Sequence, residues 1–446
     1  METPILDFLR EYEKKNMSRL HMPGHKGIGP LGCEGWDITE VKGADSLYEA
    51  EGIIARSETN AARLFGSGRT LYSTEGSSQC IRAMLALALQ NRPAGSGPVV
   101  LAGRNAHRSF LSAAALLDLE VEWLWPEGEG RSLCSCPITP EGLEGELSAM
   151  ERPPFAVYIT SPDYLGGRAD IAALGEVCHR RGIPLLVDNA HGAYLHFLEK
   201  PCHPLDLGAD LCCDSAHKTL PVLTGGAYLH VSPNAPKGMG EGARGVMALF
   251  GSTSPSYLTL ASLDGCNGWL AEEGPGRIRG TAEGLAGVKA KLLQQGWRLW
   301  GEEPLKLTVD AAASGWRGDE LGELLRAGGV EPEFADRDYV VLMASGNTRG
   351  EELQRLAEAF ARGRPQPGEP VAAPALTRGK RVMSIRQAML SPQEELTVEE
   401  CVGRVCAAPT VSCPPAVPIL VCGEVVDEAA VERFRYYGID RCVVIK

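Results

Sequence analysis

The stretch that decides the fold is GADLCCDSAHKTLPVLTGGAYLHV, residues 208–231. Lys218 lies in a short polar segment with an apolar run on either side. A lysine that is partly desolvated is more readily neutral, and the neutral amine is the form that makes an imine with an aldehyde. Ser215 and His217 supply a hydroxyl and an imidazole close by, and the TGG turn at 224–226 lets the backbone pass near a ligand. The alternative is a surface lysine in a loop.

Thirty residues earlier, the segment PLLVDNAHGAYL (184–195) places Asp188 at the carboxyl end of a predicted buried strand. In an open α/β sheet this end faces the ligand crevice. An aspartate there can keep a pyridinium nitrogen protonated, which makes pyridoxal 5′-phosphate (PLP) an electron sink. The alternative is that Asp188 caps the next turn. Because Asp188 is followed by His191 and then by the cluster around Lys218, we predict a PLP enzyme in which Lys218 holds the cofactor as a Schiff base and Asp188 pairs with its ring nitrogen.

The segment TEGSSQCIRAMLALAL (74–89) is a candidate phosphate site. Gly76, Ser77 and Ser78 precede a predicted helix, so that backbone amides and two hydroxyls point at one spot. The alternative is an ordinary helix N-cap.

Two further segments carry polar candidates. His107 follows the predicted strand VVLAG (99–103) and could stack on a flat ring, or be structural. Ser252 and Thr253 lie in the hydroxyl-rich segment FGSTSPSYLTLASLD (250–264), which could also be a simple turn.

Composition narrows the classes of partner. The chain has 446 residues, 44% of them hydrophobic and 23% charged, with a net charge of −13. An acidic surface argues against nucleic acid or an anionic membrane as the main partner. No run approaches 18 apolar residues and the N-terminus lacks the apolar core of a signal peptide, so we expect a cytoplasmic protein. The fourteen cysteines show no paired C-x-x-C spacing, so we expect free thiols and no metal site.

Apolar runs alternate with helical segments through the middle of the chain. Examples are FAVYIT (155–160), PLLVD (184–188) and GAYLHV (226–231). This alternation predicts an α/β fold, with a large domain whose mainly parallel sheet is covered by helices and a smaller C-terminal α/β domain. The expected zones are an N-terminal arm (1–45), the large PLP-binding domain (46–265), the small α/β domain (266–363), a Pro-rich linker (364–375) and a C-terminal tail (376–446).

With these segments in view, the sequence resembles the short-form bacterial ornithine/lysine/arginine decarboxylases, fold type I PLP enzymes related to the aspartate aminotransferases. The resemblance covers nearly the whole chain. The matching segments are HMPGHKG (21–27), DITEVKGADSL (37–47), GSS (76–78), RNAHRS (104–109), TSPDYLG (160–166), DNAHGA (188–193), DSAHKT (214–219), STSPSY (252–257) and PPAVPILVCGE (414–424).

The resemblance implies a role for each candidate. Lys218 would be the Schiff-base lysine, Asp188 the partner of the pyridine nitrogen, and His107 the residue stacked on the ring. His191 would lie beside the ring. The residues implied at the phosphate are Ser77, Ser78, Ser215 and His217, with Ser252 and Thr253 reaching the cofactor of a neighbouring subunit, because the family's active sites lie at a dimer interface. A homodimer or larger homo-oligomer with shared active sites is therefore expected.

The resemblance implies decarboxylation of arginine, lysine or ornithine, with His217 or Lys218 returning a proton to Cα. The alternatives are transamination, racemisation or elimination on the same scaffold, or a catalytically silent regulatory protein. A cationic substrate entering a desolvated pocket needs a carboxylate, for which Glu424 and Glu331 are candidates, although either could be a solvated surface charge. The chain departs from the family pattern at Asn189, at Glu75 and in CPPAVP (413–418). The departures at Asn189 and in CPPAVP could change the substrate pocket, and with it the amino acid that is used.

Overall fold

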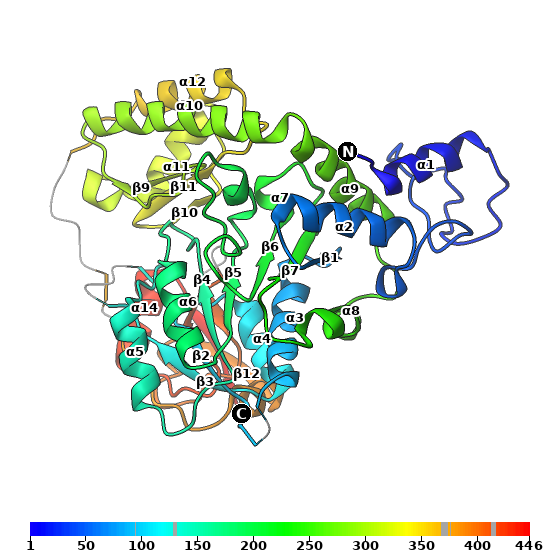
Figure 1. The fold of residues 1–446 in the computed structure, drawn as a ribbon. Helices are drawn as coiled ribbons and strands as arrows, with labels where there is room; N and C mark the ends of the chain where they lie inside the picture. Colours follow the sequence, from blue (N-terminus) through cyan, green and yellow to red (C-terminus); the bar gives the residue numbers. More distant parts are fainter. Residues whose placement is uncertain (94, 128–131, 367–372, 375, 412–415) are drawn as a thin grey trace. The chain divides into compact units, whose positions relative to one another are not determined.

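The computed structural model describes residues 1–446 except 94, 128–131, 367–372, 375 and 412–415 (Figure 1). The chain forms two compact units. Unit 1 comprises Met1–Pro93 and Cys178–Arg279, and unit 2 comprises Ala94–Val177 and Gly280–Lys446. Helices α6 (Ile171–Arg180) and α10 (Gly274–Gln294) span the two boundaries along the chain.

The strands of unit 1 lie in the order β1-β7-β6-β5. Their bounds are β1 (Arg69–Ser73), β5 (Leu185–Asp188), β6 (Leu211–Asp214) and β7 (Ala227–Val231). Strands β5 and β6 are parallel, whereas β7 is antiparallel to both β6 and β1. Only a short helix and a turn separate β6 from β7, and a parallel return needs a longer crossover connection. The predicted runs PLLVD and GAYLHV are confirmed as strands.

Helices cover these strands, and α3 packs against α8 and against strands β6 and β7. The helical elements of unit 1 are α1 (Pro4–Lys14), η1 (Leu47–Glu49), α2 (Ile53–Phe65), α3 (Ser77–Gln90), η2 (Ala193–Phe197), α7 (Ala216–Thr219), α8 (Met239–Leu249) and α9 (Tyr257–Ala271).

The N-terminal helix α1 is capped by a residue that is distant in the sequence. Thr3 makes no side-chain cap and Pro4 has no N–H, so the first amides of the helix need another acceptor. The amides of Ile5 and Leu6 donate to Oδ2 of Asp264 in α9, at 2.9 and 3.0 Å. Asp264 is fully buried, and burial raises the pKa of its carboxyl from 3.8 to about 6.

We expect Asp264 to make the stability of the protein depend on pH. The Asp264 carboxyl loses its proton near pH 4 in the unfolded chain but only near pH 6 in the folded chain. The protonated carboxyl therefore contributes to the free energy of unfolding at low pH, and this contribution is lost as the pH rises through 6. The shift corresponds to about 3 kcal/mol of the free energy of unfolding. Asp264→Asn stays neutral, so urea unfolding should show the variant gaining stability relative to the parent between pH 4 and 7. Parallel pH profiles of the two proteins would contradict this assignment.

Unit 2 contains a second group of parallel strands, in the order β4-β2-β3. Their bounds are β2 (Val99–Gly103), β3 (Glu120–Leu124) and β4 (Ala156–Thr160), accompanied by α4 (Arg108–Leu117) and α5 (Pro140–Ala149). A separate antiparallel sheet has the order β10-β11-β9-β8. It consists of β8 (Leu299–Trp300), β9 (Lys306–Asp310), β10 (Phe334–Ala335) and β11 (Tyr339–Met343), with η3 (Ala312–Ser314), α11 (Gly318–Ala327) and α12 (Gly350–Phe360).

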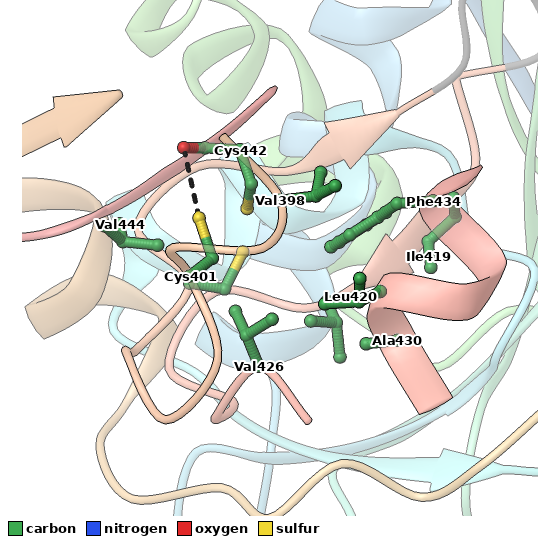
Figure 2. Close-up of a cluster of buried hydrophobic side chains, with 11 residues drawn as sticks. Val398, Cys401, Ile419, Leu420, Val426, Ala430, Phe434, Cys442 and Val444 are labelled. Atoms are coloured by element: carbon green, nitrogen blue, oxygen red, sulfur yellow. Dashed lines mark hydrogen bonds between the residues drawn. The ribbon is translucent and has the colours of Figure 1, made fainter. Parts of the chain in front are cut away.

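The C-terminal part of unit 2 has its own buried cluster, in which Phe434 lies beside Ile419 and Leu420 (Figure 2). Its elements are α13 (Ile385–Leu390), β12 (Gln393–Thr397), β13 (Thr410–Val411), β14 (Pro418–Leu420), α14 (Glu428–Tyr436) and β15 (Arg441–Ile445). The buried Arg104 guanidinium donates to the carbonyls of Pro418 and Ile419, both at 2.9 Å. The tail therefore packs on the segment that contains β2.

The two units do not coincide with the predicted zones. The zone 46–265 is divided between them, and the tail 376–446 belongs to the same unit as residues 94–177. Most of the predicted linker 364–375 lies outside the described residues. Within the described part of the chain, all cysteines are free thiols, and no helix is both long enough and apolar enough to cross a membrane.

Candidate active site

Three of the predicted site residues, Asp188, His191 and Lys218, lie at or just after the ends of strands β5 and β6. These strands are parallel and Asp188 pairs in register with Cys213, so the segments that follow them leave the same edge of the sheet. This is the edge at which open α/β sheets bind ligands. The segment after β5 carries His191, and the segment after β6 carries Lys218.

Lys218 lies in the short helix α7, next to His191. Its Nζ is 2.7 Å from Nε2 of His191, although 27 residues separate the two in the sequence. Lys218 is half-buried and His191 is buried. The alternative of a surface lysine in a loop is therefore not what the structure shows, because the amine is held against an imidazole on a neighbouring segment.

Asp188 is buried at the last position of β5, with 2% of its surface exposed. Its Oδ1 accepts a hydrogen bond from the amide of Ala190 at 3.3 Å, which is the turn-capping contact considered above. The Sγ of Cys213 donates to the same oxygen from 3.6 Å. Burial raises the pKa of the Cys213 thiol well above its ordinary value, so the thiol stays protonated and acts as a donor.

The candidate phosphate site is the beginning of helix α3. The helix starts at Ser77, and its N-cap Gly76 has a φ of 71°, a conformation that favours glycine. Ser215 Oγ donates to Ser77 Oγ at 2.8 Å, so hydroxyls 138 residues apart are adjacent. First-turn amides and hydroxyls at a helix N-terminus suit a phosphate, and Ser78 lies in this first turn.

The TGG turn brings this helix end close to α7. The Gly76 amide donates to the Gly225 carbonyl at 2.7 Å, and a Cβ on Gly225 would lie 2.8 Å from the Thr74 carbonyl oxygen. The Nδ1 of His217 donates to the Gly226 carbonyl at 3.0 Å, which fixes the orientation of the ring. Glycine at position 225 is thus needed for the two backbones to approach, and the predicted close approach of this turn to a ligand stays a prediction.

Ser252 and Thr253 have exposed side chains in the segment before α9. The Ser252 amide donates to Oε1 of Glu75 at 3.1 Å, next to Gly76 of the same chain. Their predicted contact with the cofactor of a neighbouring subunit stays a prediction.

His107 belongs to unit 2, where it is the N-cap of α4. Its Nδ1 accepts a hydrogen bond from the Ser109 amide at 3.1 Å. His107 lies four residues after the end of β2, in the segment in which the sequence placed it, and the stacking on a ring stays a prediction.

The two glutamates proposed for a cationic substrate also lie in unit 2. Glu331 is exposed and forms an ion pair with Arg326 at 2.7 Å. Glu424 is buried, but its Oε2 accepts the Val421 amide at 2.9 Å, so that it closes its own turn at the wall of a cavity of about 540 Å³. Both glutamates therefore already have partners within their own unit.

Sequence reasoning missed a buried polar cluster around Asp214, the last residue of β6. Asp214, His203 and His230 are all fully buried, and both imidazoles contact the Asp214 carboxylate. Asp214 ends a strand just as Asp188 does, and the same positional argument applied to β6 would have singled it out.

The residues present fit PLP by their chemistry. The Lys218 amine faces the buried His191 imidazole, and the Asp188 carboxylate lies at the end of β5. The hydroxyls of Ser77 and Ser215 meet at the N-terminus of α3. These are the groups needed to hold an aldehyde, a pyridine nitrogen and a phosphate.

The fold is α/β and of the fold type I PLP-dependent class. The chain is similar to the constitutive lysine decarboxylase of Escherichia coli, with a TM-score of 0.77, 19% identity, and coverage of 100% of this chain and 82% of that one. It is also similar to the lysine decarboxylase of Francisella novicida, with a TM-score of 0.80, 16% identity, and coverage of 99% and 79%. A serine palmitoyltransferase of Sphingomonas wittichii has a TM-score of 0.57 at 14% identity, covering 81% of this chain and 83% of that one.

The chain belongs to the Orn/Lys/Arg decarboxylase family, whose major-domain model matches residues 34–343. Two relatives named arginine decarboxylase are similar over nearly their full length. The relative from Halalkalibacterium halodurans is 28% identical over 97% of this chain and 93% of its own length. The relative from Bacillus subtilis is 26% identical over 96% and 92%. The predicted family, fold class and assignment as an amino-acid decarboxylase are confirmed.

Proposed function

We propose that this chain decarboxylates a basic amino acid at a PLP site built around Lys218, and that arginine is its substrate. The observation that carries the proposal is the 2.7 Å contact of Lys218 with His191, at the strand edge where Asp188 also ends its strand. The names of the relatives support arginine over lysine and ornithine.

Each residue has a defined task in this proposal. Lys218 holds the cofactor, Asp188 keeps the proton on its ring nitrogen, and His191 orients the Lys218 amine. The phosphate is bound by the hydroxyls and amides at the start of α3, from Gly76, Ser77 and Ser78, together with Ser215. When bound, PLP supplies an electron sink for the electrons that remain at Cα after CO₂ leaves. His217 or Lys218 returns the proton to Cα.

The experiment is a product screen with arginine, lysine, ornithine and a panel of neutral amino acids, read by mass spectrometry together with CO₂ release. Arginine should give its amine and an equal amount of CO₂. A keto acid, the opposite enantiomer or an elimination product without CO₂ would instead identify another reaction of the same scaffold. Turnover of neutral amino acids alone, with no inhibition by the basic ones, would refute the substrate class.

We further propose that the protein works as a homodimer or a larger homo-oligomer in the cytoplasm. The segment between the end of helix α1 and the start of η1 exposes several large apolar side chains, and such exposure is typical of a surface that binds another protein. These are Met17, Leu20, Met22, Ile28 and Leu31. The free thiols of the described residues are typical of proteins from a reducing compartment.

A hybrid experiment tests the shared site. Lys218→Ala and the double variant Ser252→Ala/Thr253→Ala are each expected to be impaired, and mixing them should restore part of the activity, because one site of a hybrid dimer has neither defect. If Ser252 serves the site of its own chain, as its contact with Glu75 also allows, each site of the hybrid keeps one defect and mixing restores nothing.

A further inference from the structure

Asp214 lies at the centre of a buried hydrogen-bond network in unit 1. Its carboxylate accepts Nδ2 of Asn189 at 2.7 Å, Nε2 of His203 at 2.9 Å and Nε2 of His230 at 3.3 Å. None of the side chains of Asp214, Asn189, His203 or His230 is exposed to solvent. Three donors thus converge on one carboxylate where no water competes.

The neighbouring groups determine where the protons lie. The Leu205 amide donates to Nδ1 of His203 at 3.3 Å, so the proton of this imidazole is on Nε2, facing Asp214. Nδ1 of His230 lies 2.8 Å from the Thr70 hydroxyl, and burial lowers the pKa of His230. Burial alone would favour a protonated Asp214, but the two histidines outweigh it and lower the pKa of its carboxyl.

Two imidazoles and a carboxylate can also hold a metal ion. Here the Leu205 amide occupies Nδ1 of His203, which leaves the proton on the nitrogen that a metal would need. The network is therefore better described as a set of hydrogen bonds.

The network joins the two segments that form the candidate active site. Asp214 ends β6, directly precedes Ser215 and lies four residues before Lys218, while Asn189 directly follows Asp188. The bond between Asn189 and Asp214 consequently ties the turn after β5 to the last residue of β6, one position beyond the last register pair of the two strands.

We infer that Asp214 is a positioning residue of the decarboxylase site, which holds the segment carrying Asp188 and His191 in register with the segment carrying Lys218. This inference rests on the proposed function, in which these three residues bind and use PLP. Asp214 acts through its hydrogen bonds to Asn189, His203 and His230 and touches neither cofactor nor substrate.

The test compares Asp214→Asn with Asp210→Asn in the full chain. An asparagine at 214 has no negative charge and turns an amide donor toward one of the three donors as they now stand, so the network must rearrange. Asp210, which directly precedes the same strand, is a matched control. It is buried and accepts His179 Nε2 at 2.9 Å and the Leu185 amide at 2.8 Å.

The measurements are thermal unfolding, PLP affinity after removal of the cofactor, and visible circular dichroism of the reloaded protein. Both variants should lose stability. Asp214→Asn should bind PLP about 10-fold more weakly and change the visible dichroism, while Asp210→Asn stays within about 2-fold of the parent. Equal PLP affinity and dichroism in Asp214→Asn and the parent would overturn the inference.

A second variant covers the case in which Asp214→Asn does not fold. Asn189→Ala removes one donor and leaves both histidines on Asp214, and it should weaken PLP binding in the same direction. Unchanged binding in Asn189→Ala would also overturn the inference. If the parent protein itself does not bind PLP, the proposed function fails, whereas normal loading of the parent and of these variants refutes only the role of Asp214.

Discussion

Replacing Lys218 with alanine is expected to abolish both the visible absorption of the lysine-bound cofactor and the release of CO₂. Lys218 on α7 carries the amine that lies 2.7 Å from Nε2 of His191. Alanine removes this amine, so no group remains there to bond to the cofactor. Loss of a group that bonds covalently to the reacting system typically costs on the order of 10³-fold or more in rate. The absorption spectrum of the purified variant and a CO₂ assay with arginine measure the two effects.

Lys200→Ala is the matched control, because Lys200 is exposed in the segment after η2. It should keep the spectrum and the rate of the parent. Full turnover by Lys218→Ala would overturn the whole interpretation of the site, whereas loss of both signals in Lys200→Ala as well would point to a general loss of folded protein.

Asp188→Asn should keep PLP and lose most of the catalytic rate. The asparagine can still accept the Ala190 amide and still face the ring nitrogen, so the fold and the binding of the cofactor survive. It carries no negative charge to keep that nitrogen protonated, and removal of a preorganised electrostatic group costs about 10²-fold or more. The expected change lies in kcat, with the visible absorption retained.

The variant Cys213→Ala tests whether the charge of Asp188 or the packing around it matters for the rate. It removes the thiol that donates to Asp188 from 3.6 Å but leaves the carboxylate in place, so its effect on kcat should be far smaller than that of Asp188→Asn. A near-normal rate in Asp188→Asn would show that the pairing with the ring nitrogen is misassigned.

Local sequence patterns predicted much of this architecture. The apolar runs at 99–103, 184–188 and 226–231 correspond to strands β2, β5 and β7, because continuous apolar runs between turn residues are a short-range signal. Strand ends, glycine turns and helix starts are local as well, which is why Lys218, Asp188 and the Gly76–Ser78 segment could be named in advance. The antiparallel direction of β7 could not be predicted from local sequence, because it depends on how β7 pairs with its neighbours in the sheet.

Tertiary structure decided the contacts between residues that are distant in the chain. Arg104 binds the carbonyl groups of Pro418 and Ile419, more than 300 residues away, and this joins the tail to residues 94–177. The sequence by itself determined the class of chemistry, because that depends on which residue types stand at strand ends and helix starts. Only the fold decided that Lys218 meets His191 and that Asn189 meets Asp214, because hydrogen bonds act over about 3 Å and only the parallel pairing of β5 with β6 brings those segments within that distance.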